Sequence, residues 1–449
     1  MKIFTLILFM TSVVLADDSL STKIHDPYVS MRAMGMGNAF TAVADDYSLI
    51  FYNPAGFAKK RYNEVQFTLV GAGYSPNTLT LADELKTATA SGTDSQKATA
   101  VSNVLDKYYG KTLGGKVQAA EIFWTRKNWG IALIPVDLSV DLSFNRQLGP
   151  AIDMNVIADT TIAYGYGKEL NKFWSAGLTA KYVHRDAIDQ SVSALELATD
   201  SNLLSTKRFK EGSSIDLNLG FMWTPDWFNK SIAKTDLKTE AKPDEKKIEE
   251  KKPADDNRTI QSEEPSSEAA SEPAAEAPPE VKPEEKAKTE EKKEPVKEVI
   301  AGITERFPLT FGLVINNILG GNFSKSTQVN KDALEAPTSM YRTLDLGSHY
   351  EMAKFGDLTL RSMIDFKNLL HPDITLNKSF HAGVEFDYFP NSWFKTQFRA
   401  GLNQMYFTGG LTFLFGVIHI DAVTYGEEVG SATTKIQNRV YAAKLGFNF

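Results

Sequence analysis

Hydrophobic and polar residues alternate with a period of two along much of this chain. In the segment 215–223, one face carries Ile215, Leu217, Leu219, Phe221 and Trp223, whereas the other carries Asp216, Asn218 and Gly220. The segments 380–388 and 394–403 repeat the pattern. Strict alternation of this kind predicts half-buried β-strands.

Fourteen segments with strand character can be identified. They cover residues 61–73, 116–126, 129–145, 153–169, 174–189, 213–225, 306–318, 341–353, 356–368, 379–389, 393–404, 409–415, 417–425 and 436–449. Two architectures fit the alternation: a soluble sandwich with an apolar core, and a membrane barrel with an apolar outside. An even strand number closes a barrel with both chain ends on one side. The segment 75–115 would then be an outer loop with helical character.

The end of the chain favours the membrane barrel. Tyr441, Leu445, Phe447 and Phe449 share one face of the last strand, and the final residue is aromatic. This resembles the terminal strand that bacterial outer-membrane barrels present to their insertion machinery, which we therefore expect as a partner.

The tryptophans also favour the barrel. Short turns are predicted near residues 127, 171, 391 and 416, and every tryptophan lies within a few residues of the end of the barrel that these turns define. The residues are Trp124, Trp129, Trp174, Trp223, Trp227 and Trp393. This placement predicts an aromatic girdle at one membrane interface. We therefore expect an all-β fold, a transmembrane antiparallel β-barrel of about fourteen strands in contact with outer-membrane lipid.

The first residues and the composition define the compartment. Residues 1–16 combine Lys2, a short apolar run and a small residue before Asp17, which predicts a secretory signal peptide, with a buried N-terminal helix as the alternative. The chain has no cysteine, so a lipoprotein anchor, disulfides and thiolate metal sites are excluded. The expected location is the outer membrane of a Gram-negative-type bacterium.

The composition changes abruptly in the middle of the chain. Residues 229–304 are rich in Glu, Lys and Pro, and no aromatic residue occurs between Phe228 and Phe307. Such a segment cannot bury enough apolar surface to fold, so we expect a disordered periplasmic linker. A plain solvated linker and a contact segment for a periplasmic partner both remain open. The linker divides the barrel into a first half, 61–228, and a second half, 305–449.

The sequence contains no motif that indicates an enzyme. No nucleophile elbow or zinc-protease motif occurs, and the six histidines include no pair at metal-ligand spacing. We expect no catalytic residue, cofactor or metal, and no nucleic acid as partner.

The stretch "MRAMGMGNAFTAVADDYSLIFYNPAGFAKK" (31–60) is the most distinctive in the chain. Its glycines do not form a complete dinucleotide-binding loop, and adjacent carboxylates rarely converge on one substrate atom. As structure it makes better sense: small residues allow compact packing, and Asn-Pro-Ala-Gly forms a turn in which Gly56 lets the chain reverse. We predict that residues 17–60 are an N-terminal plug inside the lumen. The motif comprises Gly35, Gly37, Asn38, Phe40, Asp45, Asp46, Asn53, Pro54, Ala55 and Gly56.

This motif resembles the plug of the FadL/TodX-like outer-membrane channels, a superfamily that includes PorV-like and TraF-like barrels. The resemblance covers about residues 31–58 closely and the last strands more loosely. It implies a plugged barrel through which hydrophobic or amphipathic molecules, such as long-chain fatty acids, diffuse without a cofactor. The PorV-like relatives imply an alternative: a non-transporting barrel that docks envelope or secreted proteins, with the linker as contact segment.

Charged residues on the polar face of the late strands are expected to line the lumen. They are Arg361, Asp365, Lys367, Glu385, Asp387, Lys395 and Arg399. Mixed signs on neighbouring strands favour cross-strand ion pairs that hold the barrel shape. The alternative is a polar lumen that keeps an amphipathic ligand out of the lower barrel.

Overall fold

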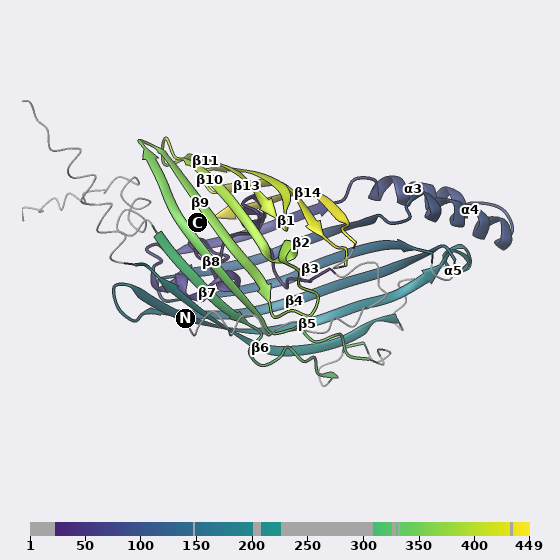
Figure 1. Ribbon diagram of the computed structural model, residues 1–449, viewed down its shortest axis with the longest axis horizontal. Helices are drawn as coiled ribbons and strands as arrows, with labels where there is room; N and C mark the ends of the chain where they lie inside the picture. Colours follow the sequence, from purple (N-terminus) through teal and green to yellow (C-terminus); the bar gives the residue numbers. More distant parts are fainter. Residues whose placement is uncertain are drawn as a thin grey trace, which may run out of the picture. The chain divides into compact units, whose positions relative to one another are not determined.

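The computed structural model describes residues 23–146, 149–200, 208–225, 309–325, 329–330, 333, 335–431 and 434–449. Fourteen strands form one closed antiparallel barrel, in which each strand pairs with its sequence neighbours and β1 pairs with β14 (Figure 1). The predicted fold class is therefore confirmed. The expected signal peptide (1–16), the first residues of the expected plug (17–22), the whole of the expected linker (229–304) and Trp227 lie outside the described residues.

The strand bounds agree with the sequence prediction to within a few residues at each end. The strands are β1 Glu64–Tyr74, β2 Thr112–Arg126, β3 Trp129–Asn145, β4 Ala151–Glu169, β5 Trp174–Ser193, β6 Lys210–Trp223, β7 Leu309–Asn316, β8 Thr343–Phe355, β9 Leu358–Leu369, β10 Phe380–Tyr388, β11 Phe394–Asn403, β12 Tyr406–Phe415, β13 Ile418–Glu428 and β14 Gln437–Asn448.

The apolar faces of the strands point out of the barrel. On β6, Ile215 is 67% exposed, whereas its neighbour Asp216 is completely buried. The same holds on β4 and β5, where Ile162, Tyr164 and Leu178 are exposed. This is the reverse of a soluble sandwich, whose apolar faces form the core, and it is the pattern of outer-membrane barrels.

The N-terminal segment lies inside the barrel. It contains the short helices α1 (Met31–Gly35) and α2 (Leu49–Tyr52) and the 3₁₀ helix η1 (Pro54–Ala58). Almost every residue from 28 to 60 is buried. Its aromatic side chains form one apolar cluster with inward residues of the wall, including Phe123, Ala163 and Met363. The predicted plug thus shares a small apolar core with the barrel wall.

The two ends of the barrel differ. One end, called here the turn end, carries the short connections at 127–128, 170–173, 389–393 and 416–417. The other, the loop end, carries the helices α3 (Thr78–Thr89), α4 (Asp94–Lys107), α5 (Ala194–Thr199) and α8 (Leu376–Ser379). A capping box between Thr93 and Gln96 starts α4. None of the helices in the described ranges is long and apolar enough to cross a membrane.

Candidate functional site: the plugged lumen

The plug backbone packs directly on the backbone of the wall at positions where the wall has glycine. A Cβ atom added at Gly177 would collide with Pro54, one at Gly312 with Thr41, and one at Gly383 with Met36. Wall glycines whose added Cβ would meet plug atoms in this way are Gly130, Gly165, Gly167, Gly177, Gly220, Gly312, Gly347, Gly383, Gly401 and Gly410. Strand glycines often mark such close backbone approaches.

The Asn-Pro-Ala-Gly turn is anchored to both plug and wall. The Asn53 amide donates to the carbonyl oxygens of Thr41 (2.8 Å) and Phe221 (3.1 Å), and its oxygen accepts from the Ala55 N–H (3.1 Å). Pro54 begins the 3₁₀ helix. The φ of Gly56 is not positive, and glycine is needed there because a Cβ would strike the Ala44 carbonyl oxygen.

The glycine-rich start of the motif makes the remaining plug contacts. Gly37 has φ +69° and lies against Ala382 and Leu402, so it needs glycine both for its conformation and for space. Asn38 accepts a hydrogen bond from the Tyr52 hydroxyl (2.7 Å). The N–H groups of Phe40 and Thr41 donate to the wall carboxylate of Asp365 (2.8 and 2.7 Å).

A buried charge network joins the plug to the late strands. Arg32 of α1 donates two hydrogen bonds to Glu385 of β10, from Nε (2.9 Å) and from the terminal guanidinium nitrogen Nη2 (2.7 Å). The same guanidinium reaches Asp45 (2.6 Å) and Asp46 (3.0 Å) within the plug. Arg361 of β9 then binds Asp45 (2.7 Å) and Glu385 (2.6 Å). We call these residues, with Asp387 and Arg399, the plug network.

The network determines how the acidic pair of the plug titrates. Burial alone would raise the pKa of the Asp45 carboxyl, but the Arg32 and Arg361 guanidiniums outweigh burial and lower this pKa below its usual range. For Asp46, burial prevails and the pKa is raised. Asp46 caps the following turn, because its carboxylate accepts hydrogen bonds from the N–H (2.8 Å) and the hydroxyl (2.6 Å) of Ser48.

The structure places all seven lumen charges on the inner face. Glu385 pairs with Arg361 and Arg399, and Arg361 also pairs with Asp387, so cross-strand ion pairs are present. The remaining three charged residues make other contacts. Asp365 accepts from the plug backbone, Lys367 lies over the Tyr52 ring at 4.8 Å, and Lys395 lines the cavity at the turn end.

Sequence reasoning missed Arg32. The residue stands alone in a stretch of small and apolar residues, and a buried guanidinium there requires carboxylate partners. The isolated position of Arg32 in the sequence could therefore have indicated a buried ion pair. Its wall partner Glu385, however, is 353 positions away and could not be paired with it by spacing.

Two cavities lie on either side of the plug. The cavity at the loop end has a volume of about 1140 Å³, and the one at the turn end about 300 Å³. Aromatic plug residues, Tyr28, Phe51 and Tyr52, form part of the larger cavity. Most of its lining residues are polar or charged, with Asp141, Asp153, Lys181, Arg185, Asp345 and Lys367 among them.

The five described tryptophans gather at the turn end. Trp124 contacts Trp129 at 5.2 Å between ring centroids, and Trp174 stacks on Trp223 at 5.6 Å. Trp393 lies beside Phe394 in the 389–393 connection and is 63% exposed. On the outer face of the last strand, Tyr441 is exposed and Leu445 and Phe447 are half-buried, and the exposed Phe449 ends the chain.

No model of a known protein family and no curated protein matches this sequence. Solved structures do match its fold at low identity. The toluene transporter TbuX of Ralstonia pickettii is 8% identical, with 94% of this chain and 97% of that chain covered and a TM-score of 0.42. The toluene transporter TodX of Pseudomonas putida is 8% identical, with 95% of this chain and 99% of that chain covered and a TM-score of 0.42. A FadL homologue of Pseudomonas aeruginosa is 9% identical, with 95% of this chain and 98% of that chain covered and a TM-score of 0.40.

The class of protein is defined by the chain's own architecture. Fourteen antiparallel strands close on themselves, the apolar faces point outward, and an N-terminal segment fills the lumen. This chain is a plugged β-barrel of the outer-membrane type.

A methyl group at the plug–wall contact should loosen the plug. In Gly401→Ala the new Cβ would meet backbone atoms of Met36, Gly37 and Ala382, so we expect a cost of about 1–3 kcal/mol from overpacking. Permeation of a small hydrophilic dye into cells should rise, and the thermal midpoint in detergent should fall. Gly409→Ala is the matched control, because the nearest atom lies at 3.9 Å. Equal effects of both variants would contradict the close-packing account.

The Asp45 carboxylate should stabilise the plug at neutral pH. Its pKa is lower in the folded protein than in the unfolded chain, so its contribution is complete above the unfolded value, about 4, and is lost as the pH falls toward the folded value. Asp45→Asn should therefore lower the unfolding midpoint at pH 7. The difference from the wild type should shrink below about pH 4. A pH-independent difference would show that charge is not the cause.

Proposed function

We propose that this protein is an outer-membrane channel for the passive uptake of amphipathic small molecules, with long-chain fatty acids as the expected class. The observation that carries the proposal is the plug between two cavities inside a closed barrel. The route runs from the loop-end cavity past the plug to the turn-end cavity. No covalent chemistry is involved.

The lining of the larger cavity supports amphipathic rather than purely apolar solutes. Ligand sites usually combine an apolar surface with a few oriented polar groups. Here Tyr28, Phe51 and Tyr52 offer an aromatic floor, and the ammonium groups of Lys181 and Lys367 and several carboxylates surround it. A solute with a polar head and an apolar tail matches both parts of this lining.

The remaining site residues take structural roles in this proposal. The tryptophans near the turn end form an interface girdle in the membrane. The outward residues Tyr441, Leu445, Phe447 and Phe449 form the strand that the insertion machinery reads. The signal peptide exports the chain, and the linker is periplasmic.

Uptake of a labelled long-chain fatty acid by cells that lack their own fatty-acid channel tests the proposal. We expect the wild-type protein to raise the uptake rate above that of empty-vector cells, and Gly401→Ala to change that rate while Gly409→Ala does not. Correct insertion is checked by the heat-modifiable migration of the barrel on gels. An inserted barrel without any gain in uptake would contradict the channel function.

A second function, docking of envelope or secreted proteins, is favoured by how tightly the plug is held. Direct backbone packing on the wall and the plug network both oppose movement of the plug. Deletion of residues 231–300 separates the two functions. A channel should keep its uptake, whereas a docking barrel should lose cross-linked partners in isolated membranes.

A further inference from the structure

The outer surface of β5 and β6 changes from apolar to polar toward the loop end. Outward positions below this boundary include Leu178 and Ile215, which are exposed apolar residues. Beyond it come His184 and Asp186 on β5 and Glu211 on β6. His184 and Asp186 point outward, because Arg185 between them points into the lumen and pairs there with Asp159 (2.7 Å). Glu211 points outward as well, because it lies opposite Asp186 and its neighbour Lys210 lines the lumen cavity.

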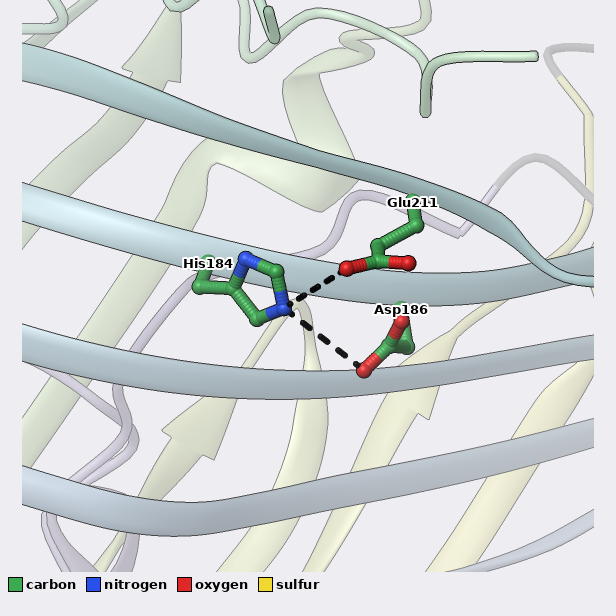
Figure 2. A group of neighbouring side chains, drawn as sticks. All are labelled: His184, Asp186 and Glu211. Carbon is green, nitrogen blue, oxygen red and sulfur yellow. Dashed lines mark ion pairs between the residues drawn. The ribbon is translucent and has the colours of Figure 1, made fainter. Parts of the chain in front are cut away.

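Two carboxylates oppose each other at this boundary. Asp186 and Glu211 are direct cross-strand neighbours in the register of β5 and β6. Like charges in such positions repel unless a cation or a proton lies between them. The Nε2 atom of His184 lies 3.3 Å from Glu211 Oε1 and 4.0 Å from Asp186 Oδ2. Figure 2 shows that the imidazole edge and both carboxylates point toward one another, with all three ligand atoms within 4.8 Å.

Neighbouring groups hold two of these side chains in place. The other ring nitrogen of His184, Nδ1, is hydrogen-bonded to Ser213 Oγ at 2.9 Å. The Glu211 carboxylate accepts hydrogen bonds from the N–H groups of Val329 (2.5 Å) and Asn330 (2.6 Å). Metal-binding histidines and carboxylates are typically oriented by such outer contacts, since these fix the tautomer and the direction of the lone pair.

We propose that His184, Asp186 and Glu211 bind a divalent transition-metal ion, with Zn²⁺ as the best-fitting ion. One imidazole nitrogen and two carboxylate oxygens suit Zn²⁺. In a tetrahedral site with bonds of about 2.0–2.2 Å, ligand atoms lie roughly 3.3 Å apart, so only small side-chain shifts would close the group. The Asp186 side chain is 38% exposed, which leaves room for water as fourth ligand.

The position of the group gives the metal a structural role. Among the described residues, β6 and β7 pair from Leu219–Trp223 to Phe311–Ile315. Closer to the loop end, the edge of β6 is covered by the segment after β7, through the Ser213–Ser324 bridge and the Glu211 contacts. A metal ion on Glu211 would hold β5, β6 and this segment together on the loop-end side of the described β6–β7 pairs.

Zinc binding to the full-length protein without a histidine tag tests the proposal. The barrel is purified in detergent, treated with EDTA, dialysed and titrated with Zn²⁺ by calorimetry, and its metal content is measured. We expect one Zn²⁺ per barrel and a rise of the thermal midpoint. His184→Ala and Asp186→Asn should each weaken binding at least tenfold. Asp186→Asn keeps the shape of a partly exposed side chain, so folding should be preserved.

The matched control is His371→Ala. His371 lies 3.8 Å from Asp373 through Nδ1 but has no third ligand in the described part of the chain, so its loss should leave the affinity unchanged. Two results would overturn the proposal: a folded wild-type barrel without stoichiometric zinc, or wild-type affinity in His184→Ala. Either would identify the group as a hydrogen-bonded brace in which His184 donates to Glu211.

Discussion

The polar interior of this barrel has to be satisfied from within, and the rest of the structure depends on that constraint. Because the apolar faces of the strands point outward, charged groups such as Glu385 are left inside and away from bulk water. A buried charge is tolerated only when it is paired and hydrogen-bonded. Glu385 meets three guanidiniums, from Arg32, Arg361 and Arg399, and one of these comes from the plug.

The plug therefore supplies hydrogen-bond and charge partners that the buried polar groups of the wall need. Asp365 faces inward on β9, and one of its carboxylate oxygens, Oδ2, accepts hydrogen bonds from two plug N–H groups. Conversely, the plug has little regular secondary structure, and its backbone groups need partners outside itself. The wall supplies them at Asp365, at Thr408, which binds the backbone of Gly35 and Gly37, and at Thr179, which donates to Ile50. Plug and wall are complementary polar surfaces.

This complementarity bears on both proposed functions. A plug held by charge pairs, hydrogen bonds and direct backbone contact can open only when several of these are replaced at once. A solute that brings a polar head could offer replacement partners, whereas a purely apolar solute could not. In a docking barrel the same contacts would act as a permanent seal and leave the outer surfaces to bind partners.

The sequence by itself determined the strand pattern, the strand number and the presence of a plug. Alternation is a local property with a period of two, so it survives without knowledge of the fold and gave strand bounds close to those observed. The plug motif was readable for the same reason, since its small residues and its Asn-Pro-Ala-Gly turn are contiguous. Only the tertiary structure decided which residues meet. Arg32 and Glu385, the wall glycines and the plug backbone, and the opposed Asp186 and Glu211 come together through barrel closure and strand register, which are long-range properties that no spacing along the chain encodes.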